Sequence, residues 1–480
     1  MTATRTLLLN PGPVTLTERV RAALARPDLC HREPEFAALQ GRIRAQLLAL
    51  YGLAPDTWTA ILLTGSGTAA VEAMVASLVP RAGRLLVLES GVYGERLRRM
   101  AEIHGIAHAS QARPWGADID WDGLAAELAQ GNYSHAAVVH HETTTGRLHD
   151  LPRLAALCAA HGVALLVDGV SSFGAEAIPF YIAGEGGGAA GGVQGLSAGK
   201  IRIAAVATLM DLVGEIPWAA TGGADRRAAW VTPEGIAWAV AGGADRRAGA
   251  APESTEGSAA TSMGSAPQPP SLSMAGAVTG GLTDGGAAAV GSVGAVGPVG
   301  AGGIAAVAGT ANKCLHGCPG VAFVIARRAA LAEAEPRSVY LDLAGHHRAQ
   351  DAGTTAFTPA VPACHALDEA LAELIEQGGP TTRLAHYREL AAVVRAGLAA
   401  AGIAPLLSEV ETSAVLAAYR LPPGLSYPRL HDHLKARGFI IYAGQGALAE
   451  SLFRVSVMGD ITRADMERFT AAVATVATAV

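Results

Sequence analysis

Short apolar runs alternate with helical patterns through the first third of the chain, and this alternation predicts its fold. Four runs are typical of buried strands: WTAILLT (58–64), RLLVLESG (84–91), HAAVVHHE (135–142) and GVALLVDGV (162–170). Between the last two, Asp150 can cap a helix, Pro152 fits its first turn and Gly162 can end it. Strands separated by such helices predict a mostly parallel sheet with helices on both faces, which is an α/β fold.

The alternation is lost after residue 180. Residues 181–303 are dominated by Gly, Ala, Ser, Pro and Val, and WAATGGADRRA (218–228) recurs almost unchanged as WAVAGGADRRA (238–248). Such a composition cannot bury enough apolar surface to offset the chain entropy lost on ordering. We therefore expect a disordered or loosely packed insertion at the surface.

Strand-like runs return on both sides of TANKCLHGCPG (310–320). The chain from about residue 365 mixes helical patterns with short predicted strands, which are SAVLAAYRL, GFIIYAG and SLFRVSVM. This second half predicts the rest of the large domain and a smaller α+β domain. The predicted organisation is an N-terminal arm (1–20), the first part of the large domain (21–180), the insertion (181–303), the second part of the large domain (304–364) and the small C-terminal domain (365–480).

Charge and cysteine content narrow the class of protein. A formal charge of −6 and a pI near 6.2 provide no basic field for nucleic acid and no polybasic patch for a membrane. No window is long and apolar enough for a membrane span, and the N-terminus lacks a signal-peptide core. Five scattered cysteines fit reduced thiols, and Cys314 and Cys318 lack a second pair at zinc spacing. We expect a soluble cytoplasmic protein without a metal site.

The chain contains only three lysines, and one of them stands out. Lys435 falls on the polar face of an amphipathic helix and Lys200 lies in the insertion, whereas Lys313 lies between two apolar strands. A buried ammonium group is costly, so such a lysine either pairs with a carboxylate or has a lowered pKa. With a lowered pKa it is a nucleophile for Schiff-base chemistry with carbonyl compounds, including pyridoxal phosphate. The sequence around Lys313 leaves both interpretations open.

Two further motifs suit the same cofactor. GSGT (65–68) lies at a strand-to-helix turn, where backbone N–H groups and hydroxyls can bind a phosphate, although small residues serve any tight turn there. Asp168 ends an apolar strand, the edge where open α/β sheets bind ligands, and it could pair with a protonated pyridine nitrogen or cap a loop. A phosphate cup, a pyridinium partner and a Schiff-base lysine, in this chain order, together point to a pyridoxal-phosphate site.

Longer motifs carry a family resemblance. They are LLLNPGPVTLTERV, TGSGTAAVEAM, ESGVYGER, HHETTTGRL, VDGVSSFGAEAIP, TANKCLHGCPGVAFVIARR, FTP, GFIIYAGQG and LFRVSVMGD, and they cover residues 5–180 and about 304–475. With them the chain resembles the class V group of fold-type I pyridoxal-phosphate aminotransferases, most closely the 2-aminoethylphosphonate:pyruvate aminotransferases. ETTTG and ANKC are the motifs most specific to that subgroup. The resemblance implies a large domain with a seven-stranded sheet, a small C-terminal domain and a homodimer.

The resemblance also implies roles for residues around the cofactor ring. Lys313 would form the Schiff base and then act as general base and general acid during the proton transfer. Asp168 would pair with the pyridine nitrogen, Val170 would pack under the ring and Tyr93 would stack on its other face. Thr143, the first threonine of ETTTG, would hydrogen-bond the 3′ oxygen.

The remaining implied roles concern anions. The cofactor phosphate would be held by Ser66, Gly67, Thr68 and Asn312, with Thr358 of FTP reaching it from the second subunit. Arg454 would bind the substrate carboxylate, a planar two-bond contact for which arginine suits better than lysine. Taken alone, an arginine at this strand end could also face solvent.

The predicted reaction transfers the amino group of 2-aminoethylphosphonate to pyruvate, giving phosphonoacetaldehyde and L-alanine. An alanine:glyoxylate or serine:pyruvate aminotransferase would share every cofactor residue. A non-catalytic protein is a third hypothesis, because the insertion enters the chain between Asp168 and Lys313 and could displace the strand before the lysine. The segment before FTP, AGTTA (352–356), lacks the basic and bulky residues that many relatives carry there.

Overall fold

The computed structural model describes residues 5–181 and 302–477, which form part of one compact unit. The predicted insertion lies outside the described residues, apart from its first residue and its last two. Gly303, which the prediction assigned to the insertion, is instead the first residue of a strand.

A seven-stranded sheet forms the centre of the large domain, in the order β2-β10-β9-β8-β5-β3-β4. Strand β10 runs antiparallel to both of its neighbours, and the remaining neighbours pair in parallel. The predicted mostly parallel sheet is therefore confirmed. Its strands are β2 (Trp58–Gly65), β3 (Arg84–Glu89), β4 (Ala107–Ala112), β5 (His135–Val139), β8 (Ala164–Asp168), β9 (Gly303–Thr310) and β10 (Gly320–Arg327).

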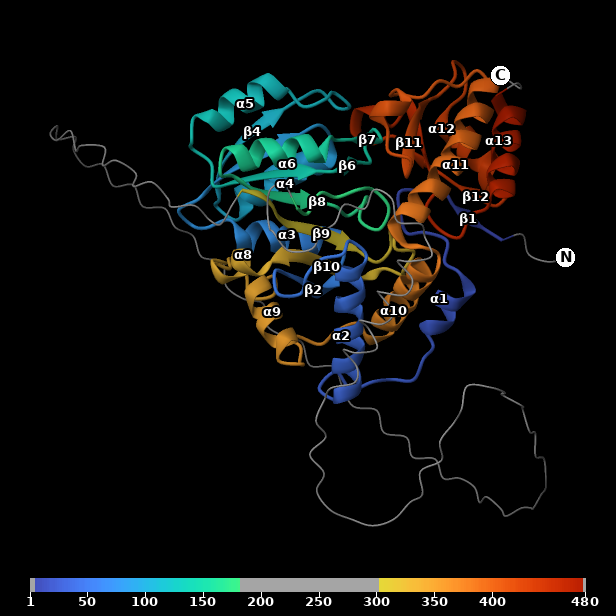
Figure 1. Cartoon of the computed structure of the whole chain (residues 1–480). Coiled ribbons are helices and arrows are strands. Elements are labelled where there is room, and N and C mark those ends of the chain that lie inside the picture. The colour runs from blue at the N-terminus through green and yellow to red at the C-terminus, as the bar shows by residue number, and fades with distance from the viewer. Residues whose placement is uncertain (1–4, 182–301, 478–480) are drawn as a thin grey trace, which may run out of the picture. The chain divides into compact units, whose positions relative to one another are not determined.

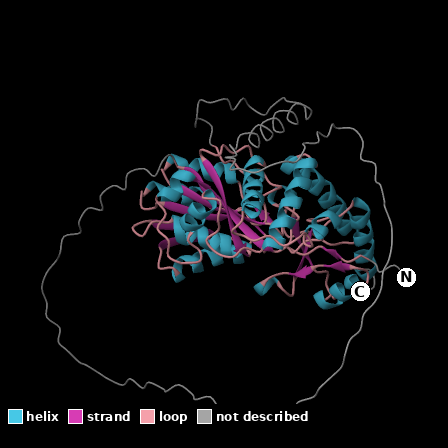
Figure 2. Ribbon diagram, turned by 90° about the horizontal axis from the view of Figure 1, so that it is seen from below, coloured by secondary structure: helices cyan, strands magenta, loops and turns pink. Residues whose placement is uncertain are grey.

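Helices cover both faces of this sheet because successive strand residues point to opposite sides. In β2, Ala60 and Leu62 belong to one core cluster, whereas Ile61 and Leu63 belong to another. Figure 2 shows the strands between helices. The first cluster includes α2 (Pro34–Ala49), α5 (Trp121–Ala129), α6 (Leu151–Ala160) and α10 (Val361–Glu376), and the second includes α3 (Gly67–Leu78), α4 (Val92–Ile103), α8 (Arg328–Ala332) and α9 (Leu343–Asp351).

The predicted start and end of α6 are confirmed. The Asp150 side chain accepts the N–H of Arg153, and Pro152 lies in the first turn. Gly162, beyond the end of the helix, has a left-handed backbone with a φ of +65°. A side chain at this left-handed position would be strained, which explains why glycine follows the helix end.

One side chain, that of Arg327, contacts the described residues on both sides of the insertion. Arg327 at the end of β10 donates from Nε to the carbonyl of Ile304 at 2.9 Å and from Nη2 to the carbonyl of Phe180 at 3.3 Å. Phe180 packs edge-on against Trp58 in the core. Strand β9 pairs with β8 on one edge and with β10 on the other. The strand that leads to Lys313 is therefore not displaced.

The small domain contains α11 (Gly379–Ala400), α12 (Tyr427–Lys435) and α13 (Arg463–Ala477) around the sheet β11-β14-β13, drawn in orange and red in Figure 1. Its strands are β11 (Leu416–Arg420), β13 (Tyr442–Ala443) and β14 (Leu452–Ser456), and two 3₁₀ turns are η1 (Glu409–Glu411) and η2 (Gly446–Leu448). Lys435 is exposed on α12, as the amphipathic pattern predicted.

The N-terminal arm connects both domains. Its strand β1 (Leu7–Leu8) pairs in parallel with β12 (Phe439–Ile440) of the small domain, and α1 (Glu18–Ala23) contacts α10. The segment GFIIYAG was expected to form one strand, but β12 and β13 join different sheets because β12 is taken by the arm. The run HAAVVHHE is also divided, since β6 (His141–Glu142) leaves the large sheet to pair with β7 (Arg147–Leu148).

Within the described ranges, no helix has the length and apolar character of a membrane span. No cluster of three or more His, Cys, Asp or Glu side chains in those ranges could hold a metal ion.

Candidate active site

Lys313 lies in the loop that follows β9, at the carboxyl edge of the sheet. Its Nζ donates to the carbonyl of Pro11, and a Cβ on Gly12 would lie 2.9 Å from Nζ, so the NPGP segment of the arm must carry glycine there. Burial lowers the pKa of Lys313 to about 8, against the opposing effect of the Cys314 and Asp168 charges. Among the described residues it makes no ion pair, which favours a nucleophilic lysine over a structural ion pair.

The loop after Lys313 is held by the small domain. His316 has a φ of +62°, and its buried Nε2 accepts the N–H of Gly459 at 2.8 Å and lies 2.5 Å from the hydroxyl of Tyr387. Arg383 donates from Nη1 to the carbonyl of Cys314 at 2.9 Å. The sequence analysis missed these contacts, because their partners lie about 70 to 140 residues away and no local motif links them.

Asp168 ends β8 and is 8% exposed. One carboxylate oxygen accepts the N–H of Val170 at 3.0 Å, and no ion pair is formed with any residue that the structure describes. Burial raises the pKa of Asp168 to about 6, and the charge of Glu142 adds to this, whereas Arg96 and Lys313 oppose it. A buried carboxylate without a cationic partner suits a protonated ring nitrogen.

The GSGT turn joins β2 to α3. Ser66 precedes the helix and its side chain makes no capping bond, so its hydroxyl is not used by the helix itself. A Cβ on Gly67 would lie 2.7 Å from Val170, which shows how closely the turn packs against the residue expected under the cofactor ring. The Thr68 hydroxyl accepts from Arg96 at 3.1 Å, and Asn312 accepts the Thr310 hydroxyl at 2.9 Å.

Tyr93 is the second residue of α4, and Glu142 fixes the start of this helix. The Glu142 carboxylate accepts the N–H groups of Tyr93 at 3.2 Å and Gly94 at 3.3 Å, and the Thr144 hydroxyl accepts that of Val92 at 3.1 Å. A Cβ on Gly91 would lie 2.4 Å from the Glu142 side chain. Burial raises the pKa of Glu142, and these hydrogen bonds oppose the rise. The role of Glu142 could not be predicted from the motif ETTTG, because the N–H groups that it accepts lie 48 and 49 residues away in the sequence.

Arg454 on β14 is a buried cation, with 4% of its surface exposed. It donates to the carbonyls of Ala443 at 2.9 Å and Thr143 at 3.1 Å and to the Gln445 amide oxygen at 3.2 Å. Burial lowers the pKa of Arg454. In the described part of the chain it has no carboxylate partner, and the alternative of a solvent-facing arginine is wrong. The small domain therefore contributes a buried cation that has only neutral partners.

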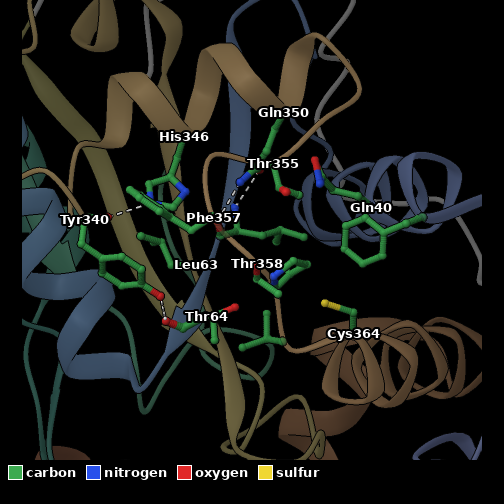
Figure 3. A pocket seen from close by; sticks show the side chains of 14 residues that line it. Gln40, Leu63, Thr64, Tyr340, His346, Gln350, Thr355, Phe357, Thr358 and Cys364 are labelled. Atoms are coloured by element: carbon green, nitrogen blue, oxygen red, sulfur yellow. Dashed lines mark hydrogen bonds between the residues drawn. The ribbon is translucent and has the colours of Figure 1, made fainter. Parts of the chain in front are cut away.

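Thr358 is the predicted site residue that lies apart from these groups. It is exposed and lines a pocket between β2, α9 and α10, beside Thr64 and Cys364, and none of Lys313, Asp168 and Arg454 lines this pocket. Figure 3 shows Phe357, Tyr340 and His346 gathered at the same pocket. In the described residues, no hydrogen bond joins Thr358 to the other predicted phosphate ligands.

The residues at the sheet edge fit pyridoxal phosphate. Lys313 is an amine with a lowered pKa, and Asp168 is a buried carboxylate without an ion pair in the described residues. The turn at Gly67 forms a tightly packed cup. His141 is a further buried group, with Nδ1 at 3.0 Å from the carbonyl of Ser171 and Nε2 without a partner in the described structure. Burial lowers the pKa of His141 to about 4, and the charge of Lys313 lowers it further.

Comparisons with known proteins bear on this interpretation. No family model matches the chain. A 2-aminoethylphosphonate–pyruvate transaminase of Aeromonas hydrophila is 28% identical over 473 residues, which are 95% of this chain and 91% of that protein. The protein of the same name from Pseudomonas fluorescens is 27% identical, with 99% and 98% covered.

Solved structures agree in fold. An aspartate aminotransferase of subgroup IV from Thermus thermophilus superimposes with a TM-score of 0.67 at 24% identity, with 99% of both chains covered. An alanine–glyoxylate aminotransferase from Nostoc sp. gives 0.68 at 18% identity, covering 99% of this chain and 96% of that one.

The fold and the relatives together confirm the predicted class, an aminotransferase of fold type I that uses pyridoxal phosphate. The predicted resemblance to 2-aminoethylphosphonate–pyruvate transaminases is also confirmed, at 25 to 28% identity over nearly the full length.

Proposed function

We propose that this chain transfers the amino group of 2-aminoethylphosphonate to pyruvate, forming phosphonoacetaldehyde and L-alanine. The observation that carries the proposal is the buried Arg454, which has neutral partners only and lies near enough to Lys313 for its charge to lower the lysine pKa. The amino donor and the amino acceptor each carry an anionic group close to the reacting carbon. One guanidinium can bind these anions in turn, and it would remain uncompensated without them. The names of the relatives support the same substrate pair.

Bound pyridoxal phosphate supplies an electron sink that stabilises negative charge at the substrate Cα. We assign the proton transfer at that Cα to Lys313, because a pKa near 8 leaves a useful fraction of the amine neutral around neutral pH. Asp168 keeps the proton on the ring nitrogen of the cofactor. Arg454 orients the substrate by its anionic end, and Tyr93 and Val170 define the two sides of the ring site.

A second candidate activity is that of an alanine:glyoxylate or serine:pyruvate aminotransferase, because the Nostoc neighbour shares the fold. A competition assay separates the two. We expect alanine to form from 2-aminoethylphosphonate and pyruvate, and excess serine or glyoxylate to inhibit it weakly. Absence of alanine with the phosphonate, together with turnover of serine or glyoxylate, would contradict the proposed substrate pair.

The contacts of Arg327 argue against a protein disabled by its insertion. They hold Phe180 and Ile304, and β9 remains paired on both edges. A protein purified without bound cofactor, and without a spectral change on adding pyridoxal phosphate and amines, would support the non-catalytic hypothesis instead.

We also propose a homodimer in which Thr358 completes the phosphate site of the partner subunit. Phe357 is 38% and Tyr340 40% exposed beside Thr358, so an apolar surface surrounds the residue that lies apart from its own site. Light scattering should give twice the chain mass. We place the enzyme in the cytoplasm, where its five free cysteines remain reduced.

A further inference from the structure

The predicted phosphate cup lacks a positive charge. Ser66, Thr68 and Asn312 offer hydroxyl and amide groups, and the start of α3 adds only the partial charge of a helix N-terminus. A phosphate monoester carries about −1.5 to −2 charges at pH 7. A cup of neutral donors leaves most of this charge uncompensated, so a cation is needed close to these residues.

Arg96 is a cation that contacts the cup directly. It lies on α4, one turn after Tyr93, and its Nη1 donates to the Thr68 hydroxyl at 3.1 Å. Its guanidinium carbon lies 4.8 Å from the centre of the Tyr93 ring. Arg96 therefore connects two residues that are expected to bind different parts of the same cofactor.

Arg96 also differs from its neighbours on the helix. Arg98 pairs with Glu89 and Glu102, and Arg99 is exposed. Arg96 is only partly exposed, and among the described residues it forms no ion pair. Its charge opposes the rise in the pKa of Asp168, so its field extends into the cofactor site. An inward arginine without a carboxylate partner is available for an anion.

We propose that Arg96 is the cationic ligand of the cofactor phosphate, acting together with the Thr68 hydroxyl. The proposal rests on pyridoxal phosphate as the cofactor but not on the identity of the amino donor. The guanidinium binds the phosphate oxygens while it remains packed on Tyr93. It thereby links the phosphate site to the ring that stacks on the cofactor.

The test compares two ligands that differ only in the phosphate. Full-length apoprotein is titrated with pyridoxal phosphate and with pyridoxal, and dissociation constants are read from the absorption of the bound ligand, without substrate. We expect Arg96→Met to weaken pyridoxal phosphate at least about tenfold, as for a lost hydrogen bond to a charged group, and to leave pyridoxal unchanged. Arg96→Lys, which keeps the charge but loses the planar fork, should recover part of the affinity.

Arg99→Met is the matched control, since it removes the same charge from the exposed side of the same helix. Arg99→Met should change neither the affinity for pyridoxal phosphate nor the affinity for pyridoxal. Equal losses for both ligands in Arg96→Met would assign Arg96 to the orientation of Tyr93 and overturn the proposal, as would unchanged affinities or an equal effect of Arg99→Met. If the parent protein bound no pyridoxal phosphate, the proposed function would fail as well. Binding by the parent without a role for Arg96 would overturn this inference alone.

Discussion

The surroundings of Lys313 and of Thr358 differ in how completely one chain builds them. Around Lys313, the arm, the large domain and the small domain all make contacts: Pro11 accepts from the amine, and Arg383 and His316 hold the following loop. Around Thr358, aromatic side chains are exposed, and the Thr355 hydroxyl is buried without a partner in the described structure. The surroundings of Lys313 are complete within one chain, whereas the surroundings of Thr358 leave aromatic side chains exposed.

This difference is what the proposed homodimer would explain. The reacting groups are fixed by contacts within one subunit, so a single chain can arrange Lys313, Asp168 and Arg454. In the proposed homodimer, the open pocket would provide a surface for the partner subunit, and the Thr358 hydroxyl would serve the partner's site. We therefore expect variants of the closed region to abolish chemistry, and variants of the open region to affect cofactor retention and assembly.

The largest effect is expected for Lys313→Ala. Removing the amine removes both the Schiff base and the proton carrier, so alanine formation should fall by more than about 10³-fold. Lys435→Ala, on the exposed face of α12, is the control and should retain activity. A Lys313→Ala enzyme with near-normal turnover would mean that another group performs the chemistry.

Arg454→Met should produce the next largest loss. The substrate anion would then face neutral groups only. Breaking a buried charged contact costs about 2 to 5 kcal/mol, so kcat/KM should fall by about 30- to 5000-fold. Cofactor affinity should change little, which distinguishes this variant from a damaged fold. A lower cofactor affinity with unchanged kcat/KM would contradict the role of Arg454 at the substrate.

Asp168→Asn is expected to change stability and cofactor binding in opposite directions. Burial raises the pKa of Asp168 from 3.8 to about 6, so its contribution to stability is present below about pH 4 and is lost as the pH rises through 6. At pH 7 to 8 the variant apoprotein should be more stable by about 1 to 3 kcal/mol. Its affinity for pyridoxal phosphate should fall about tenfold or more. Urea unfolding of the parent and the variant at pH 4 and pH 8 measures the first effect, and a stability difference between the two proteins that is the same at both pH values would contradict it.

The pH dependence of cofactor capture tests the lysine itself. The pKa of Lys313 is lowered to about 8, and only the neutral amine is nucleophilic. The rate at which apoprotein incorporates pyridoxal phosphate should level off above pH 8. Below pH 8 the rate should decrease, approaching a tenfold decrease for each pH unit. Stopped-flow absorption measures this rate, and a midpoint near the ordinary lysine value of 10.5 would show that burial does not act on Lys313.

The smallest effect is expected for Thr358→Ala. Losing one neutral hydrogen bond costs about 0.5 to 1.5 kcal/mol, so the affinity for pyridoxal phosphate should fall by about two- to tenfold. Thr355→Ala, in the same pocket, is the control. If Thr358 acts in the partner, mixed dimers of Thr358→Ala and Lys313→Ala chains should contain one site with both residues. Mixed dimers without such a site would show that Thr358 does not act in the site of the partner subunit.

Much of the fold could be predicted because its signals are local. The apolar runs that became β2, β3 and β8 are bounded by turns, and Asp150 and Gly162 mark the ends of α6 within a few residues. The predictions were wrong where tertiary pairing decided the outcome. GFIIYAG has the composition of one strand, but the N-terminal arm pairs with its first half and β14 with its second.

The sequence by itself determined the chemistry: a lysine between two apolar strands, a carboxylate at a strand end and a glycine-rich turn. It could do so because the apolar strands, the strand end and the turn that carry these residues are patterns of neighbouring residues. Only the tertiary structure decided which buried or partly buried cations lack a carboxylate partner among the described residues. Arg96 meets Thr68 across 28 residues and Arg454 meets Thr143 across 311, so their charges and burial depend on how the strands and domains pack together.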